Sequence, residues 1–193
     1  MQKTLFKKYL HITSLLIVIS FMFLSFVMLI FVSNYWQTEK QDLLKKNAES
    51  VANIAADSVT SVEDNIYTIH TERMRAFIAA FSQNINADIF VTKMDGQVVI
   101  ASYAKETKIQ GVPKVNSDIM KKAVNGFYSS QGTVGGIYSE PYYSVGVPIC
   151  VTNLDGSKTT IGAVFAAYNV SAFNIFRGDI LRMFLLAAIA AFM

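Results

Sequence analysis

The chain has 193 residues, of which 52% are hydrophobic and only 16% are charged, and its net charge is +3. A soluble domain carries about 25% charged residues and a disordered chain few apolar ones, so this composition excludes an ordinary cytosolic protein and a disordered one. The single cysteine, Cys150, excludes an intramolecular disulfide framework and a cysteine-rich metal site.

The positive charge is concentrated at the N-terminus. Residues 1–36 carry three lysines and no acidic residue, whereas residues 37–176 carry 12 basic and 13 acidic residues. This nearly neutral middle offers no broad basic surface, so the sequence predicts no nucleic-acid partner.

The first predicted element is a membrane helix. Residues 9–38 contain no Asp, Glu, Lys or Arg, and about 20 apolar helical residues suffice to cross a bilayer. A signal peptide has an apolar region of only about 7–15 residues, so we interpret residues 1–36 as a cytoplasmic N-terminus with an uncleaved transmembrane helix. Tyr35 and Trp36 suit the outer interface, and the lysines place the N-terminus in the cytoplasm. The plasma membrane is the expected location, with residues from about 37 to 176 outside the cytoplasm.

Residues 37–83 are predicted to form one long extracytoplasmic stalk helix, because no Pro or Gly occurs from Asn34 to Gln83. Apolar or small residues recur in steps of three and four, which is typical of one helix face. This seam consists of Leu44, Ala48, Val51, Ala55, Ser58, Val62, Ile66 and Ile69. It can pack on its own domain or against a second copy, and we expect a homodimer through the membrane and stalk helices, with dimerisation nearer the membrane.

Residues 84–172 are predicted to form the main extracytoplasmic domain, an α+β fold with an antiparallel sheet of about five strands. Residues 87–102 read as a hairpin with Asp95-Gly96 at its turn. A short helix is expected over residues 118–124. The remaining strands are expected over residues 133–139, 142–151 and 159–170. Pro148 predicts an edge position or a bulge in the fourth strand, and the apolar fifth strand is expected to be central.

Residues 173–193 are predicted to contain a linker helix and the start of a second transmembrane helix. The apolar stretch over residues 183–193 covers roughly 16 Å of helix, about half a bilayer. Arg177, Asp179 and Arg182 precede it and suit the outer interface. We therefore expect the sequence to be a portion of a longer protein. The alternative is an amphipathic C-terminal anchor.

Three stretches carry a family resemblance: the hairpin Ala87-Asp-Ile-Phe-Val-Thr-Lys-Met-Asp-Gly-Gln-Val-Val99, then Ser144-Val-Gly-Val-Pro-Ile149 and Asp155-Gly-Ser-Lys-Thr-Thr-Ile-Gly-Ala-Val-Phe165. With the preceding membrane helix, they resemble the single-Cache, or PDC, sensor domain, a PAS-like extracytoplasmic domain of bacterial membrane receptors. The whole chain is similar to the N-terminal part of a two-component sensor histidine kinase. The resemblance implies a small extracellular ligand on the concave face of the sheet, and a response regulator that acts through the cytoplasmic kinase part. Chemoreceptors and diguanylate cyclases carry the same domain type, so these outputs stay open.

No catalytic constellation, metal site or cofactor site is predicted, so the chain itself is not expected to be an enzyme. The two histidines, His11 and His70, lie far apart in the sequence, and the stretch at Gly132 lacks the Lys of a phosphate-binding loop. A pilin-like structural subunit is a remote alternative. Such subunits carry a Glu early in the apolar segment, which residues 9–38 lack.

Six residues are the candidates for ligand binding. Arginine suits carboxylate or phosphate ligands, and tyrosine offers an apolar ring with a hydroxyl group. The candidates are Arg73 and Arg75 near the end of the stalk helix and Tyr128, Tyr138, Tyr142 and Tyr143 in the sheet region. The alternative for each is a surface arginine or a half-buried sheet tyrosine.

Overall fold

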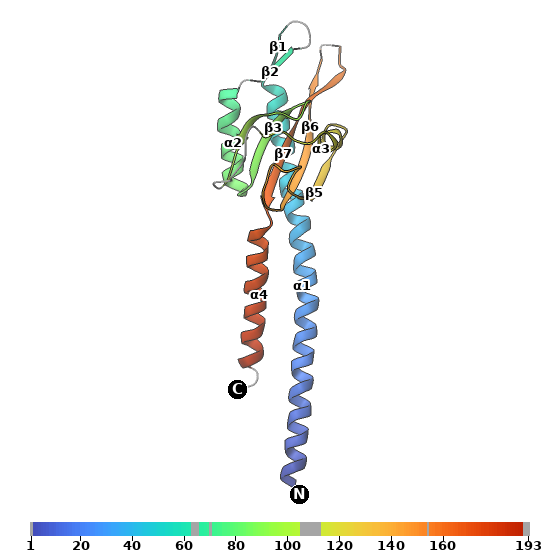
Figure 1. The fold of residues 1–193 in the computed structure, drawn as a ribbon, viewed down its shortest axis with the longest axis vertical. Helices are drawn as coiled ribbons and strands as arrows, with labels where there is room; N and C mark the ends of the chain where they lie inside the picture. The colour runs from blue at the N-terminus through green and yellow to red at the C-terminus, as the bar shows by residue number, and fades with distance from the viewer. Residues whose placement is uncertain (1, 63–65, 70, 105–112, 154, 191–193) are drawn as a thin grey trace. The chain divides into compact units, whose positions relative to one another are not determined.

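The computed structural model describes residues 2–62, 66–69, 71–104, 113–153 and 155–190. Its elements are helices and an antiparallel sheet, which confirms the predicted α+β class (Figure 1). The chain divides into two compact units. One comprises residues 39–170, and the other comprises residues 1–38 and 171–193.

Helix α1 runs from Gln2 to Asp57 without interruption. Its N-terminal part is long and apolar enough to cross a membrane, and it is the one helix with this property among the described residues. Two hydroxyl groups in the apolar part donate hydrogen bonds to backbone carbonyls one helical turn earlier. Ser25 donates to the carbonyl of Phe21 at 2.8 Å, and Thr13 donates to that of Tyr9. These bonds satisfy the hydroxyls of Thr13 and Ser25 within the helix, as suits an apolar surrounding.

The predicted helical seam is confirmed as far as Ala55. Leu44, Ala48, Val51 and Ala55 are buried within the unit of residues 39–170. Of the two packing modes left open by the sequence, packing on the chain's own domain therefore applies to these four positions.

The prediction of a single helix through residue 83 is wrong. After α1 ends at Asp57, β1 (Val59–Val62) pairs antiparallel with β2 (Ile66–Ile69), and a separate helix α2 follows from Thr71 to Ile85. The reason is the β-branched content of this stretch, which favours extended backbone. The residues concerned are Val59, Thr60, Val62, Ile66, Thr68 and Ile69. His70 lies outside the described residues.

The main sheet has five antiparallel strands in the order β4-β3-β7-β6-β5. They are β3 (Asp88–Lys93), β4 (Val98–Ser102), β5 (Tyr128–Gly132), β6 (Tyr142–Thr152) and β7 (Lys158–Asn169). The predicted hairpin is confirmed, and so is the central position of the apolar strand β7. The prediction of a strand over residues 133–139 is wrong. The strand in this region, β5, ends at Gly132, and residues 133–141 form a loop.

The turn of the β3–β4 hairpin uses the residues that the sequence indicated. Gly96 has a φ of 85°, and the Asp95 carboxylate accepts a hydrogen bond from the Gln97 amide at 2.9 Å. The position of Pro148 is also explained. Pairing of β6 with β5 stops at Gly146, and the register of β6 with β7 shifts between Ile149 and Cys150. Pro148 thus lies where β6 has become an edge and next to a bulge, as expected for a residue without an amide proton.

The two faces of the sheet are covered by different elements. Helix α3 (Ser117–Val124) and the loop of residues 133–141 cover one face, where they bury Phe90, Phe165 and Tyr128. We call this the α3 face. The other face packs against α1, because Lys40 lies over the ring of Tyr168 and Ala52 shares a pocket with Val147.

Helix α4 runs from Ser171 to Ala190, and a single residue, Val170, separates it from the end of β7. Within the unit of residues 1–38 and 171–193, the ring of Phe173 stacks on that of Trp36 with centroids 4.2 Å apart. Unlike α1, α4 does not meet the length and composition expected of a membrane-crossing helix, because Arg177, Asp179 and Arg182 interrupt its first half.

Candidate functional site

Three of the four candidate tyrosines come together. Tyr128, Tyr138 and Tyr142 are buried in the core of the α3 face. The rings of Tyr138 and Tyr142 stack with centroids 3.8 Å apart and an interplanar angle of 13°. Tyr143 pairs with Tyr168 in the sheet register and therefore lies on the other face, toward α1.

The two candidate arginines lie apart from these tyrosines. Arg73 and Arg75 are exposed on α2, whose inward side buries Met74 and Ile78. Helix α2 packs on β3 and β4, and none of its buried residues belongs to the core of the α3 face. The structure thus does not join the arginines and the tyrosines in one site.

A row of three residues crosses the sheet beside Tyr138 and Tyr142. Asp88 on β3 pairs with Ala167 on β7, and Ala167 pairs with Ser144 on β6. Partners in register share a face, and Asp88 lies two residues before Phe90, so the row belongs to the α3 face. The carboxylate of Asp88 and the hydroxyl of Ser144 therefore flank the small side chain of Ala167, which is fully buried.

Together with Tyr103, Tyr138 and Tyr142, Asp88 and Ser144 make up what we call the polar cluster. Three of its members are deeply buried, since the exposed fraction is 3% for Asp88 and 2% for both Ser144 and Tyr138, whereas Tyr103 is partly exposed. The Asp88 carboxylate accepts a hydrogen bond from the Ala104 amide at 2.9 Å. In contrast, the Ser144 hydroxyl has no hydrogen-bond partner among the described residues, and the Tyr138 hydroxyl makes no hydrogen bond within 3.5 Å there, although the Asp88 carboxylate lies near enough to act as a weak acceptor and to raise the pKa of Tyr138.

Two unpaired hydroxyls are unusual in a buried core. Most buried polar side-chain atoms are hydrogen-bonded, and an unpaired one costs about 1–3 kcal/mol. Each hydroxyl can donate one hydrogen bond and accept others. The cluster is therefore equipped to bind a small polar molecule, with stacked aromatic rings on one side of it.

Burial and a nearby negative charge raise the pKa values of two phenols of the cluster, Tyr138 and Tyr103. Burial, and after it the Asp88 carboxylate, raise the pKa of Tyr138 well above its usual value. The same two causes, in the same order, raise the pKa of Tyr103. Both phenols thus remain hydrogen-bond donors, and the nearby negative charge favours this state.

The loop of residues 133–141 holds Tyr138 over the sheet, and we call it the roof loop. A tight turn shapes it: the amides of Gly136 and Tyr138 both donate to the carbonyl of Thr133, at 3.2 and 3.1 Å. Val134 adopts a φ of 50°, which is rare for a β-branched residue. Such strain persists only where the surrounding structure enforces it, and here Val134 is buried in the core of the α3 face.

Two hydrogen bonds fasten the end of the roof loop to the end of β7. The Val170 amide donates to the carbonyl of Pro141 at 3.2 Å, and the Asn169 side-chain amide donates to the Glu140 carboxylate at 3.3 Å. The loop that carries Tyr138 is thereby tied to the residue immediately before α4.

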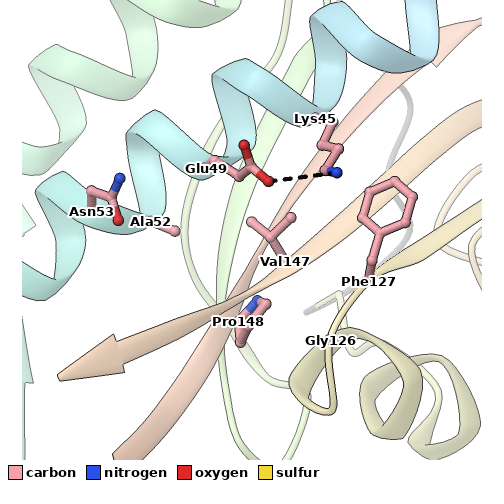
Figure 2. Close-up of a pocket in the computed structure, with 8 residues that line it drawn as sticks. All are labelled: Lys45, Glu49, Ala52, Asn53, Gly126, Phe127, Val147 and Pro148. Atoms are coloured by element: carbon pink, nitrogen blue, oxygen red, sulfur yellow. Dashed lines mark ion pairs between the residues drawn. The ribbon is translucent and has the colours of Figure 1, made fainter. Parts of the chain in front are cut away.

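A separate, open pocket with a volume of about 430 Å³ lies on the α1 side of the sheet (Figure 2). Lys45 lies 3.9 Å from Glu49 and 5.0 Å from the centre of the Phe127 ring, so its charge already has partners. The other lining residues are Ala52, Asn53, Gly126, Val147 and Pro148. None of the sequence-predicted residues lines this pocket.

Sequence reasoning missed Asp88, Tyr103 and Ser144. A signal existed for Asp88, because it is a charged residue that opens the otherwise apolar strand Ile-Phe-Val. Ser144 stands in the same way within the apolar strand β6. Within the described residues, no group of three His, Cys, Asp or Glu side chains is placed to hold a metal ion.

In comparisons with known proteins, no family model and no curated protein matches this sequence.

Proposed function

We propose that the chain is the extracytoplasmic sensing and transmembrane signalling portion of a bacterial sensor histidine kinase. In this proposal residues 39–170 are the ligand-binding domain, and α1 and α4 cross the plasma membrane, with the N-terminus in the cytoplasm. The observation that supports it is the polar cluster, in which the buried hydroxyls of Tyr138 and Ser144 lack hydrogen-bond partners. The cluster lies on a sheet whose central strand, β7, is separated from α4 by a single residue.

The unpaired hydroxyls support binding rather than a structural role. A core built for stability pairs its buried polar atoms or replaces them with apolar ones, and exceptions concentrate at functional sites. A ligand with its own donors and acceptors would complete the bonds of Tyr138 and Ser144. The stacked ring of Tyr142 would exclude water from these bonds and so strengthen them.

The roof loop offers a route from the ligand to the membrane helix. A ligand bonded to Ser144 and Tyr138 favours the roof-loop position that makes both bonds. Through Pro141 and Glu140 that position is linked to Val170 and Asn169, the last residues before α4. The roof loop is taken to have two positions, one that bonds the ligand and one that does not. The ligand can shift the equilibrium between them only by the difference in its affinity for the two positions.

The test is a ligand screen on the full chain in phospholipid nanodiscs. A panel of amino acids, carboxylic acids, amines and sugars is scored by thermal shift, and the dissociation constant of each hit is measured by calorimetry. Ser144→Ala and Tyr138→Phe should each weaken binding of a hit by about tenfold or more, since one buried hydrogen bond contributes about 1.4 kcal/mol.

Ser129→Ala is the matched control, because Ser129 is an exposed serine on the edge strand β5 of the same sheet. It should leave the dissociation constant unchanged. Hits that bind Ser144→Ala and Tyr138→Phe as tightly as the unmodified chain would remove the polar cluster from the binding site.

A further inference from the structure

Three aromatic rings and one arginine gather where α1 and α4 meet, and we call them the Trp36 cluster. The Phe173 ring stacks on that of Trp36 with centroids 4.2 Å apart, and Phe173 is only 4% exposed. The Phe176 ring lies 6.5 Å from that of Phe173. The guanidinium of Arg177 completes the cluster at 5.9 Å from the centre of the Phe173 ring, within the range of a cation–π contact.

Of the two arginines on α4, only Arg182 has a carboxylate partner among the described residues. Its guanidinium lies 3.6 Å from the Asp179 carboxylate. Arg177 is exposed and forms no ion pair within the described part of the chain. Its contact with Phe173 uses the charge of the guanidinium but none of its five N–H donors. Arg177 can therefore bind an anion, and its planar donors suit the oxygen atoms of a phosphate group.

The Arg177 guanidinium lies close to the level of the aromatic rings. The backbone of Arg177 is roughly 6 Å along α4 from Phe173, on the same face of the helix. Helical side chains lean toward the N-terminus of their helix, and the contact with Phe173 shows that Arg177 does so. In the proposed function this end of α4 is at the outer membrane surface, where tryptophan side chains concentrate. The guanidinium then lies among lipid headgroups rather than acyl chains.

We propose that Arg177 binds the phosphate of an anionic phospholipid in the outer leaflet, with the Phe173 ring behind the guanidinium. This inference rests on the membrane topology of the proposed function. Arg177, Asp179 and Arg182 are the charged residues of α4, and the last two form an ion pair, so one positive charge remains. A headgroup with one net negative charge balances it. A zwitterionic headgroup adds an ammonium group, for which α4 has no second carboxylate.

A lipid bound in this way holds α4 at a fixed depth. Movement of α4 along its axis would draw Arg177 away from the headgroup layer, at the cost of this contact. The anionic-lipid content of the outer leaflet therefore biases the position of α4, and it acts beside the ligand rather than through the polar cluster.

Trp36 supplies the measurement, because it is the only tryptophan of the chain and belongs to the cluster. The full chain is placed in phosphatidylcholine vesicles that contain lipids with brominated acyl chains, which quench a nearby indole. Comparison of brominated phosphatidylglycerol with brominated phosphatidylcholine gives their relative binding constant beside Trp36. Phosphatidylglycerol should be favoured by about fivefold, the effect of one basic side chain at a membrane surface. High salt should reduce this preference.

Arg177→Gln should abolish the preference, whereas Arg177→Lys keeps the charge without the planar donors and should retain part of it. Lys8→Gln is the matched control, because it also removes one positive charge but lies at the cytoplasmic end of α1 in the proposed topology. Asp179→Asn combined with Arg182→Gln removes the ion pair at constant net charge. Both controls should keep the preference. A parent chain without preference, or an Arg177→Gln chain that retains it, would contradict the proposal.

Two further measurements separate the possible failures. Excess inorganic phosphate, compared with chloride at equal ionic strength, should leave the preference unchanged, and its loss would mean that the site binds free phosphate instead of lipid. If brominated phosphatidylcholine does not quench Trp36 at all, the topology of the proposed function fails together with this inference. Equal quenching by the two lipids would refute the lipid site alone.

Discussion

Tyr138 and Ser144 each bury a hydroxyl group without a hydrogen-bond partner among the described residues, and this sets an expectation for stability. Removing a buried unpaired polar atom while keeping the shape of the side chain removes its desolvation penalty. Tyr138→Phe and Ser144→Ala should therefore raise the free energy of unfolding of the ligand-free protein, each by about 1 kcal/mol. Chemical denaturation followed by circular dichroism measures this change.

Ser129→Ala again serves as the control and should change the free energy of unfolding by less than about 0.5 kcal/mol, as surface substitutions do. A loss of stability in Tyr138→Phe would mean that its hydroxyl has a structural partner, and would count against a site kept open for a ligand.

The raised pKa values of Tyr138 and Tyr103 predict how stability depends on alkaline pH. Unfolded tyrosine ionises near pH 10, and in the folded state the pKa of both residues is higher because of burial and then Asp88. Their contribution to stability is complete below about pH 10 and is lost as the pH rises through the folded-state values. Asp88→Asn removes the negative charge and should lower both pKa values.

Ultraviolet titration of phenolate absorbance in Asp88→Asn, with and without Tyr138→Phe, measures this shift. Tyr168 is the internal reference, because its pKa is raised by burial alone and it lies on the other face of the sheet. If Tyr138 titrates at the same pH with and without the Asp88 charge, the two residues are not coupled.

At the scale of elements, the contact between β7 and β3 leaves no space for a side chain at Gly162. A Cβ atom there would lie 2.1 Å from the carbonyl oxygen of Thr92, which is backbone and cannot turn aside. Gly162→Ala should therefore destabilise the fold by about 2 kcal/mol or more, as overpacking of a core does. Thermal or chemical denaturation measures the loss.

Gly132→Ala is the matched control, since Gly132 also lies in a strand but has nothing within 4 Å of the added Cβ. It should be neutral or slightly stabilising, because alanine has less backbone freedom to lose than glycine. Equal effects at the two positions would contradict the close packing of β7 on β3.

The elements that the sequence predicted correctly are those with strong local signals. The Asp95-Gly96 turn defines the β3–β4 hairpin, and the long apolar run defines the first part of α1. The end of α1 at Asp57 could not be found in this way. Val62, Ile66 and Ile69 are spaced as on one face of a helix, but their β-branched side chains suit a strand equally well. Only the pairing of β1 with β2 decides between them.

The polar cluster was predictable only in part, for a different reason. Tyr138 and Tyr142 were selected for their chemistry, and the structure brings them into stacking contact. The sequence could not place Asp88 beside Ser144, because that proximity depends on two strand registers that meet at Ala167. Nor could it separate Arg73 and Arg75 from the tyrosines, since this depends on where α2 packs.

At the scale of the whole molecule, the expected topology is a cytoplasmic N-terminus and an exported domain. Lys3, Lys7 and Lys8 precede the uncharged part of α1, and positive charge is retained on the cytoplasmic side. Alkaline phosphatase is active only outside the cytoplasm. Fused after Ser102 it should be active, and fused after Lys8, as the control, it should be inactive. An inactive fusion at Ser102 would overturn the proposed orientation.

The hydrogen bond from the Val170 amide to Pro141 makes this amide a built-in reporter. Its exchange with deuterated solvent requires the bond to open, so the exchange rate measures how often the roof loop detaches from the end of β7. A compound that holds the roof loop closed would slow exchange at Val170, and one that lifts it would accelerate exchange. One backbone position would thus report which compounds close the roof loop and which open it.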